Sequence, residues 1–258
     1  MMLKTVFDKA KQNNKNVFIP YFPAGYPTIS KSKKVFKQLS KSGSDIIEVG
    51  IPFSDPLADG PTIQKASTVA LDAGLRIEQV FKALGEIKGD LPPTIIMTYY
   101  NLLYANGLKN FARKAAKAGV AGVIIPDLPV DESGEWVRLS KDHIETVFLA
   151  APTSSDERIR KIDKATTSFI YCVSVTGVTG ALNALPRSLS SFLKRVKGVA
   201  KNPLAVGFGV SKKEQVKQIN EIADGVIVGS AIIKAYEKAK SEKEALKNVD
   251  SLIRKLTS

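Results

Sequence analysis

The chain has 258 residues, of which 44% are apolar and 24% are charged. That length accommodates one large α/β domain, and the composition is ordinary for a soluble globular protein. No apolar run approaches the roughly 20 residues of a membrane helix, and a lone cysteine, Cys172, excludes an internal disulfide. We therefore expect one domain over residues 1–258, in a cytoplasmic enzyme with no membrane association.

The N-terminal segment, residues 1–16, has the pattern of a short amphipathic helix. It lacks the apolar core and the small-residue cleavage site of a signal peptide, so we expect an extra helix before the first strand. The formal net charge of +13 invites a nucleic-acid hypothesis. The lysines are spread over nearly every predicted helix, however, and no basic block contains stacking aromatic residues. We therefore expect solvated lysine faces and no nucleic-acid partner.

Short β-branched segments alternate with amphipathic helical segments along the rest of the chain. The predicted strands are 17–22, 45–51, 94–100, 122–127, 146–151, 168–175, 203–209 and 225–230. Helical patterns between them include 109–119, 156–166 and 188–198, and the expected C-cap glycines are Gly43, Gly119 and Gly198. This alternation predicts parallel βαβ units, and eight of them predict a (β/α)8 barrel. A doubly wound open sheet is the main alternative, but no G-x-G-x-x-G follows the first strand.

Two acidic residues stand where a barrel places its catalytic groups, at the carboxyl end of a strand and in the loop that follows. Glu48 interrupts an otherwise apolar strand, and a buried carboxylate is costly unless it is paired or neutralised. Asp59 lies in the next loop, where a turn-capping role is an equally good interpretation. The long irregular stretch 175–187 is interpreted as an active-site loop. Together these features indicate acid/base chemistry by carboxylates.

Glycines gather in the loops after the last three predicted strands. These loops contain Gly177 and Gly180, then Gly207, Phe208 and Gly209, and finally Gly229 and Ser230. Glycines let backbone N–H groups approach an anion closely, and Ser230 begins a predicted helix whose N-terminus favours negative charge. The alternative is that these glycines serve turns only. Barrels often bind phosphate in this region, so we predict a phosphate site here.

The sequence lacks the residues that several other kinds of chemistry require. No lysine stands at the carboxyl end of a predicted strand, so a Schiff-base aldolase lacks its nucleophile. The one histidine, His143, lies at the end of a helix, so the histidine cluster of a catalytic metal site is absent and no metal is expected. Cys172 lies in a strand without a histidine to activate it and is interpreted as a core residue. Carboxylate-driven carbon–carbon or proton chemistry remains.

The segment IIEVGIPFSDPLADGPTIQ, residues 46–64, closely resembles the most distinctive stretch of tryptophan synthase alpha chains. The resemblance continues at 97–101, 124–133, 174–180, 206–211 and 228–232, and so covers essentially the whole chain. It implies a lyase that cleaves indole-3-glycerol phosphate to indole and glyceraldehyde 3-phosphate. In the family the residue matching Glu48 is the acid/base, and the residue matching Asp59 interacts with the indole N–H.

The resemblance also implies roles for other residues. Tyr171 is expected to reach the catalytic centre, Phe22 and Met97 to line the indole pocket, and Thr179 to help close the site. The residues matching the phosphate-binding positions are Gly180, Phe208, Gly209, Gly229 and Ser230. This chain has Val175 where some family members carry Arg, so a contact of that Arg at the base of the loop would be missing here.

The family's alpha chain assembles with a β chain that carries pyridoxal phosphate, and an αββα heterotetramer is expected, with no cofactor in this chain. Asp55 and Pro56 are expected to contact the partner. The apolar Phe53 and Leu57 of the same loop pack either on the barrel rim or under the β chain. The alternatives are a stand-alone lyase without a β partner, a related isomerase, and a non-catalytic subunit that only activates a partner.

Overall fold

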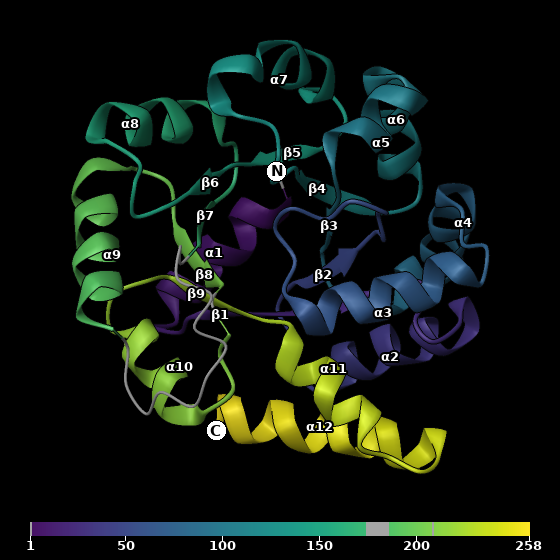
Figure 1. The fold of residues 1–258 in the computed structure, drawn as a ribbon. Helices are drawn as coiled ribbons and strands as arrows, with labels where there is room; N and C mark the ends of the chain where they lie inside the picture. The colour runs from purple at the N-terminus through teal and green to yellow at the C-terminus, as the bar shows by residue number, and fades with distance from the viewer. Residues whose placement is uncertain (1, 174–185, 208) are drawn as a thin grey trace.

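The computed structural model describes residues 2–173, 186–207 and 209–258, and within them parallel strands occupy the centre with helices around them (Figure 1). The strands are β1 Val17–Pro23, β2 Ile47–Gly50, β3 Thr94–Met97, β4 Val120–Ile124, β5 Glu145–Val147, β6 Leu149–Ala150, β7 Ile170–Val173, β8 Leu204–Gly207 and β9 Gly225–Val228. Their order is β5-β4-β3-β2-β1-β9-β8-β7-β6. Neighbours along the chain are therefore neighbours in the sheet, as in a barrel.

Helices follow nearly every strand and cover the outside of the sheet. They are α1 Met2–Gln12, α2 Ile29–Lys41, α3 Pro61–Asp72, α4 Ile77–Ile87, α5 Tyr100–Asn106, α6 Leu108–Lys117, α7 Gly134–Ser140, α8 Asp156–Ala165, α9 Arg187–Val199, α10 Lys213–Asn220, α11 Ser230–Glu237 and α12 Glu242–Thr257. Short 3-10 turns lie at Lys88–Asp90 and Val130–Glu132. None of the described helices is long and apolar enough to cross a membrane.

The barrel closes where the predicted fifth strand, 146–151, is divided in two. β5 pairs with β4 and β6 pairs with β7, and only Phe148 separates the two strands. Barrel strands are tilted and staggered, so one segment can meet its two neighbours at different heights. The two ends of the nine-stranded order are thus one continuous piece of chain. The predicted (β/α)8 barrel is confirmed, with its fifth strand recorded as two short ones.

Side chains alternate between the barrel interior and the layer under the helices. The interior cluster consists of Leu3, Phe7, Val17, Ile19, Ile46, Ile95, Ile124, Val147, Phe169, Ala205 and Ile227. The larger outer cluster joins the strands to the helices. Because every second residue of a strand faces inward, Ile46 fixes the orientation of β2: Glu48 and Gly50 also point into the barrel.

Helix α1, the expected extra helix, closes the amino-terminal end of the barrel. Leu3 and Phe7 enter the interior cluster, and the Phe7 ring lies 5.1 Å from that of Phe169. Glu145 accepts a hydrogen bond from Leu3 N–H at 2.8 Å, which satisfies one of the free N–H groups at the start of the helix. Among the described residues, the carboxyl end of the barrel is therefore the end left for a site.

The end of the third strand and the end of α9 both differ from the expectation. The third strand ends at Met97 and not at residue 100, because the carboxylate of Asp127 accepts the N–H of Tyr100 at 2.9 Å and α5 begins there. Gly198 lies inside α9, whose cap is Ala200, so its predicted role as a C-cap is wrong. Gly43 and Gly119 do follow helices with φ of +92° and +90°, a conformation that favours glycine.

Candidate active site

Glu48 and two tyrosines share the interior near the carboxyl ends of the strands. Tyr21 of β1 lies in register with Glu48 of β2, and both face inward. Tyr171 of β7 faces inward from the other side of the barrel, since Phe169 two residues earlier belongs to the interior cluster. The charge of Glu48 contributes to raising the pKa of both tyrosine hydroxyls. The structure therefore brings Tyr171 together with Glu48, as the sequence predicts, and adds Tyr21, which the sequence reasoning missed.

Glu48 is held in an environment that favours its neutral form. Its side chain is 1% exposed, and neither carboxyl oxygen has a hydrogen-bond partner among the described residues. Burial, with a smaller contribution from the charge of Asp59, raises the pKa of Glu48 to about 8. At neutral pH such a group is mostly protonated and can donate a proton, and its carboxylate is then a strong enough base to take one back.

The same environment makes the stability of the protein depend on pH at Glu48. The pKa of Glu48 rises from 4.5 in the unfolded chain to about 8 in the folded one, so the protonated form of Glu48 stabilises the folded state. This contribution is complete below pH 4.5 and is lost as the pH rises through about 8. A Glu48→Gln variant has no such titration. Its stability relative to the wild type should therefore increase by at least about 2 kcal/mol between pH 5 and pH 8.5. Urea unfolding of both proteins at the two pH values measures this, and parallel pH dependences would contradict it.

Asp59 approaches the same centre from the loop between β2 and α3. Its Oδ1 atom is buried and finds no hydrogen-bond partner among the described residues. Burial raises the pKa of Asp59 to about 6, although a hydrogen bond with the Tyr99 hydroxyl opposes the shift. Glu48 is thus mainly protonated and Asp59 mainly ionised at neutral pH. Two carboxyl groups held in different states suit one proton donor and one fixed anion.

Two glycines make room for the tyrosine rings. A Cβ atom on Gly50 would lie 2.1 Å from the Tyr21 hydroxyl, and one on Gly207 would lie 2.4 Å from the Tyr171 hydroxyl. Real Cβ contacts are essentially never that short, so any side chain at either position would displace a ring. Burial raises the pKa of both tyrosines well above the ordinary value, and the two hydroxyls stay protonated. They can therefore donate hydrogen bonds within the barrel.

The two residues expected to line an indole pocket lie on different sides of the barrel wall. Met97 is inward-facing and partly buried, next to Gly50 in register. Phe22 points outward and is fully buried among the rings of Tyr26, Phe36 and Tyr236. The structure therefore does not bring Phe22 to the site, because consecutive residues of a strand face opposite ways. Tyr21 is the β1 residue that reaches the interior, and strand alternation from Ile19 could have identified it.

The predicted phosphate-binding residues fall partly within the described structure. Gly229 directly precedes α11, and Ser230 is the first residue of that helix. Gly209 follows β8 with φ of +46°, a left-handed conformation suited to glycine. The first N–H groups of a helix have no partner within it, so this edge of the mouth can hold an anion. Thr179, Gly180 and Phe208 lie outside the described residues, as do Val175 and Gly177.

The loop between Glu48 and Asp59 is anchored at Phe53 and exposed at Leu57. Phe53 stacks on Tyr99 with ring centroids 5.1 Å apart. Leu57 is 86% exposed, and Asp55 is exposed beside it while Pro56 is half-buried. Of the two apolar residues, Phe53 thus packs on the barrel rim and Leu57 does not. An apolar side chain on an exposed loop is a feature of contact surfaces.

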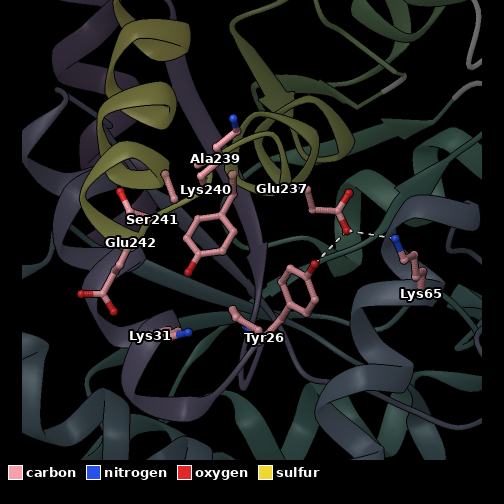
Figure 2. A pocket seen from close by; sticks show the side chains of 11 residues that line it. Tyr26, Lys31, Lys65, Glu237, Ala239, Lys240, Ser241 and Glu242 are labelled. Atoms are coloured by element: carbon pink, nitrogen blue, oxygen red, sulfur yellow. Dashed lines mark hydrogen bonds and ion pairs between the residues drawn. The ribbon is translucent and has the colours of Figure 1, made fainter.

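A cavity of about 440 Å³ lies elsewhere, outside the barrel wall among α2, α3, α11 and α12 (Figure 2). There the Tyr26 hydroxyl donates to Glu237 at 2.7 Å, and Lys65 lies 3.5 Å from the same carboxylate. Some of the charged side chains that line this cavity form ion pairs between helices. None of its lining residues is an acid with a buried oxygen that lacks a partner, whereas the barrel mouth contains two such acids. The described residues contain no cluster that could hold a metal, and Cys172 is buried in the core.

Comparison with known proteins is consistent along the whole chain. A family model described as tryptophan synthase alpha chain matches residues 7–258. The tryptophan synthase alpha chain of Methanocaldococcus jannaschii is 41% identical over 96% of this chain and 89% of its own length, and that of Petrotoga mobilis is 44% identical over 90% and 91%. A tryptophan synthase structure from Mycobacterium tuberculosis has a TM-score of 0.91 at 39% identity, covering 99% of this chain and 96% of that one. An a2b2 complex from Pyrococcus furiosus gives 0.88 at 39%, covering 93% and 97%.

Proposed function

Because the chain belongs to the tryptophan synthase alpha chain family, we propose that its barrel mouth is the site of the alpha reaction and that Glu48 and Asp59 carry it. The enzyme is a lyase of tryptophan biosynthesis, which cleaves indole-3-glycerol phosphate to indole and glyceraldehyde 3-phosphate. The observation that supports the assignment of residues is the pair of buried carboxyl groups, of which three oxygens have no hydrogen-bond partner among the described residues.

The reaction moves one hydrogen from the substrate's side-chain hydroxyl to carbon 3 of the indole ring. Protonation of that carbon comes first, because indole is a poor carbanion leaving group. Glu48, protonated at neutral pH, donates this proton, and its carboxylate then takes the hydroxyl proton as the carbon–carbon bond breaks and the aldehyde forms. The proton count closes, and Glu48 is protonated again at the end of the cycle.

The ring carries a positive charge between these two steps, and Asp59 is the anion that faces it. We assign the free Oδ1 of Asp59 to the indole N–H, where an ionised carboxylate stabilises the cation. Tyr171 and Tyr21 lie beside Glu48, and Met97 borders the ring. The phosphate lies at Gly229, Ser230 and Gly209, in the segments that follow β8 and β9. Gly180, Phe208 and Thr179 complete the proposal outside the described residues.

The partner of this chain is the tryptophan synthase β chain, and the heterotetramer is the assembly expected of the pair. Among the similar structures, the Pyrococcus furiosus one concerns mutual activation of an a2b2 complex. In this family pyridoxal phosphate is carried by the β chain, and we propose that the alpha chain needs no cofactor of its own. Asp55 and Pro56, next to the exposed Leu57, are proposed as contacts. Location in the cytoplasm and a single domain over 1–258 stay predictions.

Indole release from indole-3-glycerol phosphate tests the function directly. The isolated chain should cleave the substrate slowly, and added β chain should raise the rate well beyond the sum of the two proteins, because the interface would order the loop that carries Asp59. The titration should be repeated with Asp55→Ala and Pro56→Ala, which should weaken the activation and leave the slow basal rate. A flat titration with a fully active isolated chain would instead favour a stand-alone lyase.

A further inference from the structure

Tyr99 connects the loop that carries Asp59 to the barrel wall. It follows β3 and precedes α5, and its side chain is 2% exposed. Its hydroxyl oxygen accepts a hydrogen bond from Ala58 N–H at 3.0 Å. Its ring stacks on Phe53, five residues earlier in the same loop. One side chain therefore holds the loop at two places, and one of them, Ala58, is the residue next to Asp59.

The Tyr99 hydroxyl also influences the ionisation of Asp59 itself. A hydroxyl has one proton and two lone pairs, so accepting from Ala58 leaves its proton free for an anion. The effect of the Tyr99 hydroxyl is to lower the pKa of the Asp59 carboxyl, against the rise caused by burial. The Oδ1 atom of that carboxyl is buried and unpartnered among the described residues. Tyr99 thus favours the ionised form of Asp59, and the Oδ1 atom of Asp59 is left for a ligand.

The frame behind Tyr99 is rigid. The preceding residue, Thr98, donates its N–H to Ile124 at 3.1 Å, and the following N–H, that of Tyr100, is held by Asp127 at 2.9 Å. The loop itself contains the exposed Leu57 and is the less supported partner. Tyr99 is therefore the fixed member of this contact, and the position of the loop that carries Asp59 depends on it.

We propose that Tyr99 is the positioning residue for Asp59: its hydroxyl holds Ala58 N–H and its ring holds Phe53, so that the loop presents Asp59 beside this hydroxyl and toward the indole N–H. The proposal rests on the proposed role of Asp59 in the alpha reaction. Tyr99 acts through Asp59 and needs no contact with the reacting atoms. A hydrogen bond to the charged form of an acid favours that form.

The decisive variant is Tyr99→Phe, which keeps the ring on Phe53 and removes only the hydroxyl. Without its donor, the pKa of Asp59 should rise by about one unit from its value of about 6. If Asp59 must be ionised, kcat/KM should fall about eightfold at pH 5.5 and less than about twofold at pH 7.5. The groups that face Asp59 and could shift the profile are Glu48, Tyr21, Tyr171 and, through Tyr99, Asp127.

Three further measurements make the outcome clear. Carbon-13 NMR of labelled aspartate, with the signal assigned by its loss in Asp59→Asn, follows the ionisation without any activity. Phe53→Leu disturbs the stack but keeps the Tyr99 hydroxyl. The acid limb of the pH profile of kcat/KM, where activity falls as Asp59 is protonated, should therefore stay in place in this variant. Tyr100→Phe removes a hydroxyl from the neighbouring tyrosine and should leave both the rate and the limb unchanged.

Equal losses of kcat/KM at the two pH values, or an Asp59 signal that titrates as in the wild type, would overturn the proposal. An upward shift of both the limb and the signal supports it. A wild-type chain with no lyase activity would contradict the proposed function instead, while the NMR titration would still decide whether Tyr99 controls Asp59.

Discussion

Replacing Glu48 with Gln should lower turnover by roughly 10²-fold or more, while the substrate still binds. Gln has nearly the same shape as the protonated Glu, so the barrel interior keeps its packing. What it lacks is the proton that must reach the indole ring and the base that must accept the hydroxyl proton. The measurement is single-turnover indole release together with substrate affinity. Asp59→Asn should have a similar effect on turnover and could weaken binding of the indole part as well.

The matched control for Glu48→Gln is Glu145→Gln. Glu145 is also a buried acid, 6% exposed, but lies at the opposite end of the barrel, where it accepts the N–H of Leu3. The amide oxygen of Gln can still accept that bond, so the control should retain its turnover per folded molecule. Near-normal turnover in Glu48→Gln, or an equal loss in both variants, would remove Glu48 from its proposed role.

Replacing Gly229 with Asp should raise the inhibition constant of glycerol 3-phosphate by roughly 10²-fold or more, because two like charges would meet within a few ångströms. The substitution is not expected to weaken α11, since Asp is a favourable residue at the start of a helix. Loss of affinity would therefore report the anion site and not a lost helix. Competitive inhibition of indole release and calorimetric titration with glycerol 3-phosphate both measure it.

Gly229→Ala separates charge from bulk in this test. A Cβ atom at position 229 would lie 3.1 Å from Cδ1 of Tyr21, so some crowding accompanies either substitution. If charge dominates, the Ala variant should retain most of the affinity that the Asp variant loses. Unchanged inhibition in Gly229→Asp would place the phosphate elsewhere, and equal losses in the two variants would assign the effect to the Tyr21 ring.

The barrel and its central acid could be predicted because they rest on local patterns. Alternating strand and helix segments predict parallel βαβ units, and a Glu inside an apolar strand is conspicuous whatever its neighbours are. The division of the fifth strand could not be predicted in the same way. It depends on the stagger between non-consecutive strands, which is a property of the closed barrel and not of residues 146–151.

The side chains around Glu48 were predicted less well, for two physical reasons. Choosing Phe22 over Tyr21 required the register of β1, and an error of one residue exchanges the inner and outer faces of a strand. The role of Tyr99 required knowledge that Asp127 ends the third strand early and starts α5 at Tyr100. That contact joins residues 27 positions apart, and no periodicity in the sequence reports it.

The closure of the amino-terminal end by α1 has a consequence for traffic through the enzyme. With Leu3 and Phe7 packed into the amino-terminal end of the barrel, the described residues leave the carboxyl end for both substrate and products. Indole is small, uncharged and able to diffuse away, whereas the proposed phosphate site would retain glyceraldehyde 3-phosphate by its charge. A protein bound over the carboxyl end of the barrel would therefore control where the neutral product goes. Closure of one end of the barrel by α1 would thus direct the indole to the protein that covers the other end.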